Sequence, residues 1–199
     1  PIELPTTTRK ATQMSIATGT IADRFIPRTA VNSVVLVFAG ALVTALAAQI
    51  QIPMWPVPLT LQTFAVLLVG ATLGAGRGAA SLATYLAMGA AGLPVFASAK
   101  TLTGVLPTAG FLVGFVFAAA LVGFLASRGF TNTVIKVGFS FALGSLVIYA
   151  FGVTGLMLTL GLTLSQAVAA GVVPFLIGDA VKAVAAAALL PAAWKLVRN

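Results

Sequence analysis

The sequence predicts an all-α integral membrane protein, a bundle of six transmembrane helices with both termini in the cytoplasm. Of its 199 residues, 60% are hydrophobic and only 7% are charged, whereas a soluble globular domain carries about 25% charged residues. Charged residues are absent from Thr29 to Gly76, from Thr101 to Ser127 and from Val137 to Gly178. Each of these runs exceeds the roughly 20 apolar residues that cross a hydrocarbon core about 30 Å thick.

Proline, glycine and charged residues divide the chain into six apolar segments, because such residues mark the ends of helices. The expected spans cover residues 32–51, 59–75, 78–91, 108–127, 136–156 and 172–194. A cluster of three prolines, Pro53, Pro56 and Pro58, separates the first span from the second, since no continuous helix tolerates it. Residues 1–30 are polar and are expected to form a cytoplasmic tail rather than a signal peptide. Residues 31–199 are expected to form one transmembrane domain.

The lysines and arginines predict the orientation of the bundle. With six spans, one side of the membrane carries Arg9, Lys10, Arg24, Arg28, Arg77, Arg128, Lys136, Lys195 and Arg198. Only Lys100 then lies in an outer loop, and only Lys182 lies within a span. Cytoplasmic loops are rich in Lys and Arg, so the side with the basic residues is expected to be cytoplasmic. The sequence therefore predicts a multi-pass protein of a prokaryotic cytoplasmic (inner) membrane.

Several function classes are excluded by residues that the sequence lacks. There is no cysteine and no histidine, which removes disulfides, thiol and imidazole catalysis and the usual zinc ligands. No Gly-rich run ends in Gly-Lys-Ser/Thr, so the chain has no P-loop for ATP. The net charge of +8 is spread between apolar segments, which favours a lipid bilayer over nucleic acid as the partner. We expect neither an enzyme nor a protein with a metal or other cofactor.

Asp179 and Lys182 are the most informative polar residues of the sequence. Both lie in the last span, and residues three apart share one face of a helix. An ionisable group at membrane depth costs at least about 2.5 kcal/mol on insertion scales, so such a pair needs a compensating role. One interpretation is a polar contact to a ligand. The alternatives are a structural ion pair, a Lys182 side chain that reaches toward the interface, or a proton relay.

Four other residues are weaker candidates for a binding site. Lys100 lies in an unusually apolar connection, and it either points into an outward cavity or is a solvated loop lysine. Trp55 is either a residue of the interfacial aromatic belt or a ligand contact. Gln62, beside Thr63, opens the second span, and Tyr85 lies in the third. Helix packing alone can satisfy the polar groups of Gln62 and Tyr85.

Small residues line the first span. Ala41 and Ala45 are four residues apart, a spacing that lets helices approach closely. Packing within the chain and contact with a partner protein explain this pattern equally well.

Two segments, PVPLTLQTFAVLLVG and YLAMGAAGLPVFA, together with GDAVKA in the last span, closely resemble the BioY family. This family comprises the biotin-specific substrate-binding components of energy-coupling-factor transporters. The resemblance is strong over spans two to four. It departs in the loop around Lys100, where Ala99, Thr101, Leu102 and Thr103 stand at positions that are commonly glycine, and LPTAGF replaces the usual Gly-Pro-Thr-Gly-Gly-Tyr.

The resemblance implies a substrate-binding domain over residues 31–199 that binds biotin with high affinity near the outer face. It implies that Asp179, Lys182 and Lys100 contact biotin. It also implies partners, namely a transmembrane scaffold subunit and ATPase subunits that energise uptake. The small residues Ala41 and Ala45 then offer a surface that the scaffold subunit is expected to contact. The alternative function is a self-sufficient secondary carrier for biotin or another small vitamin, but the sequence has no clear inverted repeat of the kind such carriers show.

Overall fold

A computed structural model describes residues 19–102 and 106–198 of the chain, with side chains through Lys195. Residues 1–18, which form most of the predicted cytoplasmic tail and include Arg9 and Lys10, lie outside the described residues. Apart from one short β-hairpin, the regular structure of the described part is helical. The predicted all-α class is therefore confirmed.

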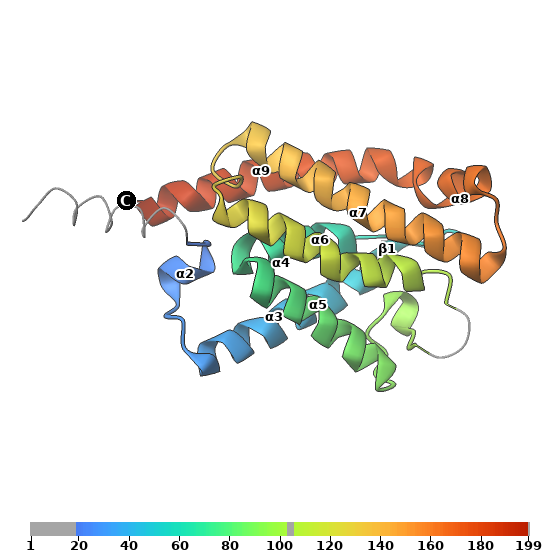
Figure 1. The fold of residues 1–199 in the computed structure, drawn as a ribbon, viewed down its shortest axis with the longest axis horizontal. Helices are drawn as coiled ribbons and strands as arrows, with labels where there is room; N and C mark the ends of the chain where they lie inside the picture. Colours follow the sequence, from blue (N-terminus) through green and yellow to red (C-terminus); the bar gives the residue numbers. More distant parts are fainter. Residues whose placement is uncertain (1–18, 103–105, 199) are drawn as a thin grey trace, which may run out of the picture.

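Six helices of 12 or more residues form the described bundle (Figure 1). They are α3 (Ala30–Gln49), α4 (Gln62–Leu73), α5 (Ala75–Ala90), α6 (Ala109–Ser127), α7 (Val134–Leu160) and α9 (Leu176–Arg198). The shorter elements are α2 (Ala22–Phe25), α8 (Leu164–Gly171) and the 3-10 turns η1 (Ala97–Ala99) and η2 (Val173–Phe175). Each predicted span coincides with one of the six long helices to within a few residues.

Four helical segments within the described residues are long and apolar enough to cross a membrane. They are α3, α6, α7 and the continuous stretch Leu164–Lys195. The other two long helices are shorter, with 16 residues in α5 and 12 in α4. At 1.5 Å per residue α4 is only about 18 Å long, so the predicted span 59–75 was too long. Helix α4 starts at Gln62 because Leu59 and Thr60 are paired in a strand, and it ends before Gly74, whose φ of 85° breaks the helix.

The extended segment before α4 forms a β-hairpin. Strand β1 (Gln51–Ile52) pairs antiparallel with β2 (Leu59–Thr60), and Gln51 lies opposite Thr60. The Leu61 N–H continues the ladder by donating to the carbonyl of Ile50 at 2.9 Å. These bonds satisfy backbone groups that a helix would otherwise satisfy internally, which is what non-helical backbone near a bilayer requires.

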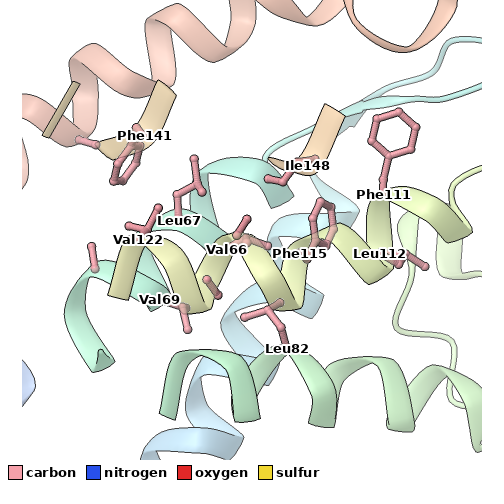
Figure 2. Packing of buried hydrophobic residues seen from close by; sticks show 14 of the residues in the cluster. Val66, Leu67, Val69, Leu82, Phe111, Leu112, Phe115, Val122, Phe141 and Ile148 are labelled. Carbon is pink, nitrogen blue, oxygen red and sulfur yellow. The ribbon is translucent and has the colours of Figure 1, made fainter. Parts of the chain in front are cut away.

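Helix α4 lies inside the bundle, with most of its residues buried. In Figure 2, Val66 and Leu67 of α4 point into the same core as Phe115 and Val122 of α6. The contact between the two helices is close at Gly70, where an added Cβ would lie 2.5 Å from the carbonyl oxygen of Ala119. Small residues thus hold α4 tightly against α6, as is common in membrane helix pairs.

At one end of the bundle, a cluster around Asp23 holds α2 against the start of α5. The Asp23 carboxylate accepts hydrogen bonds from Arg28 at 2.6 and 2.8 Å, from Arg77, and from the Thr20 N–H and hydroxyl at 3.0 and 2.8 Å. Burial by itself would raise the pKa of this carboxyl. The hydrogen bonds outweigh burial and hold the pKa of Asp23 well below its usual range.

Both ends of the described chain lie at this same end of the bundle (Figure 1). The starts of α3, α5 and α7 and the ends of α4, α6 and α9 meet there. Most of the described basic residues belong to these helix ends or to the turns beside them, namely Arg24, Arg28, Arg77, Arg128, Lys136 and Lys195. Lys100 lies in the connection between α5 and α6, at the opposite end.

Candidate functional site

A cavity opens near the end of the bundle opposite the Asp23 cluster. It encloses about 500 Å³, including its open mouth. Its walls come from the hairpin, from the connection between α5 and α6, and from α4, α6, α7 and η2. Most of the lining is apolar and includes four phenylalanines, namely Phe96, Phe111, Phe115 and Phe175. A pocket with mainly aromatic and aliphatic walls and a few polar groups is typical of a site for a small organic molecule.

Polar side chains line part of this cavity. They are Thr60, Gln62, Thr63, Thr108 and Tyr149. The Gln62 amide donates to the Tyr85 hydroxyl at 2.7 Å, and that hydroxyl donates in turn to the carbonyl of Val95 at 3.1 Å. Gln62 is therefore held in a fixed orientation at the cavity wall. Tyr85 itself is fully buried and does not line the cavity.

Asp179 and Lys182 form the predicted pair on α9, with their head groups 2.7 Å apart. Their side chains are only 10% and 13% exposed, respectively. The Lys182 ammonium also donates to the Thr60 carbonyl at 2.8 Å and to the Thr63 hydroxyl at 2.7 Å. An ammonium has three N–H donors, so the three oxygen partners of Lys182 use all of them.

The Asp179 carboxylate is held by groups from two other helices. The Thr63 hydroxyl donates to Oδ1 at 3.0 Å, and the Tyr149 hydroxyl donates to Oδ2 at 2.6 Å. Hydrogen bonds to an ionised acceptor are short and strong. The pair therefore ties α9 to α4 through Thr63 and to α7 through Tyr149.

The charged pair lies directly behind the cavity wall. Thr60, Thr63 and Tyr149 line the cavity and also bond Asp179 or Lys182, whereas neither charged residue lines it. A second, smaller void of about 190 Å³ borders the pair and shares Thr63 with the cavity. The hydroxyls of Thr63 and Tyr149 thus lie between the charged pair and the cavity, and their bonds to the pair fix their orientation.

The structure separates the other predicted site residues. Gln62 lines the cavity, with Tyr85 immediately behind it. Lys100 is exposed, and its carbonyl accepts a hydrogen bond from the N–H of Phe96, which lines the cavity. Trp55 is 83% exposed and does not line the cavity, because the hairpin that carries it turns the indole outward. Its interpretation as a ligand contact finds no support in this arrangement.

The two alanines of the first predicted span, Ala41 and Ala45, differ in how deeply they are buried. Ala41 is completely buried within the chain, so in this conformation its side chain packs against the chain's own residues. Ala45 is partly buried and packs against the hydrophobic core. The exposed face of α3 carries larger apolar side chains, among them Val35, Phe38 and Leu46.

Sequence reasoning missed Tyr149, which joins the cavity to Asp179. It is one of only two tyrosines in the chain, and a hydroxyl within an apolar span was the available signal. It also missed Phe111 and Phe115, which lie four residues apart on one face of α6 and look in the sequence like ordinary core or lipid-facing residues.

Comparison with known proteins places these features in context. A model described as the BioY family matches residues 13–199. A protein of Rhizobium etli named biotin transporter BioY is 36% identical over 178 residues, which cover 85% of this chain and 92% of that protein. A protein of Thermotoga maritima with the same name is 42% identical over 147 residues, covering 70% and 82%.

The fold is similar to that in a crystal structure described as the S-component for biotin from an ECF-type ABC transporter. The TM-score is 0.73, and the match covers 86% of this chain and 95% of that chain. At 21% sequence identity, this likeness establishes the fold alone.

We expect replacement of one member of the pair to destabilise the ligand-free protein. Asp179→Asn leaves the Lys182 charge without its counter-ion, and breaking a buried pair costs about 3–5 kcal/mol. The double replacement Asp179→Leu with Lys182→Met removes both charges and should recover most of this loss, although the hydroxyls of Thr63 and Tyr149 lose a partner. Thermal unfolding of the purified variants in detergent measures both effects.

The exposed Lys100 provides the control, because Lys100→Met removes a lysine without touching the pair. Its unfolding temperature should match that of the parent protein. A single Asp179→Asn change as harmless as Lys100→Met would show that the pair does not stabilise the bundle.

Proposed function

This chain belongs to the BioY family, and from that premise we propose that it binds biotin in the cavity and mediates biotin uptake across a prokaryotic cytoplasmic membrane. In this proposal it acts as the substrate-specific component of an energy-coupling-factor transporter. The family is one of transporters, so the chain is a transport protein and not an enzyme.

The cavity is the observation that carries the proposal. Biotin joins an apolar bicycle and a valeryl chain to a ureido group and a carboxylate. The phenylalanine-rich walls suit the bicycle and chain, and the polar side chains beside Asp179 and Lys182 suit the ureido group. The hydroxyl oxygens of Thr63 and Tyr149 can accept from ureido N–H groups, and the nearby amide of Gln62 offers a further polar contact.

Asp179 and Lys182 are proposed to act on biotin from behind this wall. Both hydroxyls donate to the Asp179 carboxylate, so toward a ligand their oxygens can act only as acceptors, and Lys182 already takes up one lone pair of the Thr63 oxygen. A modest rotation of either side chain would also let Asp179 accept directly from the ligand. Lys100 is exposed on the loop that contributes Phe96, and it remains the proposed partner of the ligand carboxylate.

We further propose that all six long helices cross the membrane, with the Asp23 end in the cytoplasm. The distribution of basic residues supports this orientation. By itself, helix α4 is too short to cross a hydrocarbon core of about 30 Å. Its crossing would be completed by the hairpin, whose second arm lines the cavity, because membrane proteins tolerate non-helical backbone where it lines a cavity.

The proposed partners are a transmembrane scaffold subunit and ATPase subunits, which would supply the energy that this chain has no P-loop to obtain from ATP. Ala45 is partly exposed and remains a candidate for contact with the scaffold subunit. The buried Ala41 would support that surface from inside.

Biotin binding tests the site. The double variant Asp179→Leu with Lys182→Met should remain folded and lose measurable biotin affinity, because the charges that orient Thr63 and Tyr149 are gone. Loss of one charge-assisted hydrogen bond, as in Asp179→Asn, should raise Kd by roughly ten- to hundredfold. Trp55→Ala is the control and should leave Kd unchanged. Wild-type affinity in the folded double variant would refute this assignment of the site.

Uptake measurements separate the proposed component from a self-sufficient carrier. We expect vesicles that contain only this chain to bind biotin but to accumulate little of it. Vesicles that also contain a scaffold subunit and ATPase subunits should accumulate biotin when ATP is supplied inside. Equal accumulation without the ATPase subunits would favour the secondary carrier instead.

Thiol labelling tests the orientation, and the absence of native cysteines gives a clean background. Ser98 lies in η1, between α5 and α6, and Asn132 lies in the turn between α6 and α7, and both residues are exposed. In intact cells an impermeant thiol reagent should label the Ser98→Cys variant and spare the Asn132→Cys variant. The reverse pattern would show that the Asp23 end faces outward.

A further inference from the structure

The connection after α5 supplies Phe96 and Ala97 to the cavity wall, and one side of it is fixed by buried contacts. The Phe96 side chain is 2% exposed and meets the Tyr85 ring edge-to-face, with centroids 5.2 Å apart. It fills the space left by Gly89, where an added Cβ would lie 2.1 Å from the Phe96 ring. The Tyr85 hydroxyl also donates to the Val95 carbonyl. These contacts anchor the connection to α5.

On the side that faces α3, one exposed side chain bonds the backbone of the connection. Gln49, the last residue of α3, donates from Nε2 to the carbonyl of Phe96 at 3.1 Å and more weakly to that of Val95 at 3.4 Å. Its Oε1 accepts from the N–H of Ala99 at 3.3 Å. A single amide group therefore binds a donor and acceptors of the same short segment. Because these bonds are neutral and are exposed or only partly buried, they break more readily than the buried contacts.

The backbone of this segment needs such support. Ser98 has φ 60° and Ala99 has φ 53°, in the left-handed region that residues other than glycine avoid. Two successive residues in this region persist only when the surrounding structure holds them. The bond from the Ala99 N–H to Gln49 acts directly on this turn. Gln51 adds a single bond at 2.8 Å, to the side chain of Ser98.

We propose that Gln49 is a positioning residue that latches residues 95–99 against α3 and so sets how often this wall of the cavity opens. Phe96 stays anchored to α5, while release of Gln49 frees the turn that holds Ala97. A latch that is equally strong with and without ligand controls entry and exit together and leaves the equilibrium affinity nearly unchanged. The inference rests on the proposed function only for the identity of the ligand as biotin.

The test compares Gln49→Leu with Gln51→Leu in the full chain. In the ligand-free protein, amide hydrogen exchange of residues 96–99 should become about tenfold faster in Gln49→Leu, as expected for the loss of one or two neutral hydrogen bonds. In stopped-flow binding, the association and dissociation rate constants for biotin should both rise by about tenfold. Kd should stay within about threefold of the parent value. Gln51→Leu removes no backbone bond of the turn and should leave all three quantities within about twofold.

Gln49→Glu is a second variant for the case that Gln49→Leu does not fold. It keeps an acceptor for Ala99 and loses the donor to Phe96, so its exchange and rate constants should lie between those of the parent and Gln49→Leu. Unchanged exchange and unchanged rate constants in a folded Gln49 variant would overturn the proposal. A raised Kd with an unchanged association rate would also overturn it, because Gln49 would then be a ligand contact. If the parent protein bound no biotin, the proposed function would fail, and amide exchange would still decide the role of Gln49.

Discussion

The position of α9 in the bundle depends on the satisfaction of one buried ammonium. Lys182 lies in a span whose other side chains are nearly all apolar, and an unpaired charge there would be too costly to keep. Its three donors reach Asp179, Thr63 and the Thr60 carbonyl. Two of these acceptors belong to the segment where the hairpin passes into α4, so α9 can pack only where those oxygens are. The same requirement places the polar groups of Thr60, Thr63 and Tyr149 in the wall of a cavity whose lining is mostly apolar.

The hairpin follows from a second constraint, the rule that backbone groups away from water must be bonded. Three prolines within residues 53–58 prevent a helix and carry no N–H that would need a partner. The remaining backbone is paired in part by β1 and β2. This irregular segment supplies Val57, Pro58 and Thr60 to the cavity wall. A continuous helix over the same residues would have packed against its neighbours, so the interruption contributes to the space for a ligand.

The sequence was sufficient to predict the helices, because a long apolar run without charged residues indicates a helix that is surrounded by lipid. It was also sufficient to place Asp179 beside Lys182, which depends only on helical spacing. It could not predict that α4 is short and enclosed, since the start of α4 is set by pairing between Gln51 and Thr60 across the hairpin. Contacts between residues distant in the sequence were equally hidden. Tyr149 meets Asp179 from a different helix, and the burial of Ala41 depends on which helices surround α3.

The bonds that hold the bundle differ in strength from one place to another, and their distribution agrees with a transport role. At the basic end, the carboxylate of Asp23, 9% exposed, binds Arg77, 14% exposed, and charge-assisted bonds in such a setting are stronger than neutral ones. The second partner, Arg28, is 67% exposed, so solvent screening weakens its share. At the cavity end, the charge-assisted bonds of Asp179 and Lys182 hold α9, whereas the neutral amide bonds of Gln49 hold residues 95–99. In the proposed opening only the bonds of Gln49 break, so this part of the wall moves while the helices stay packed.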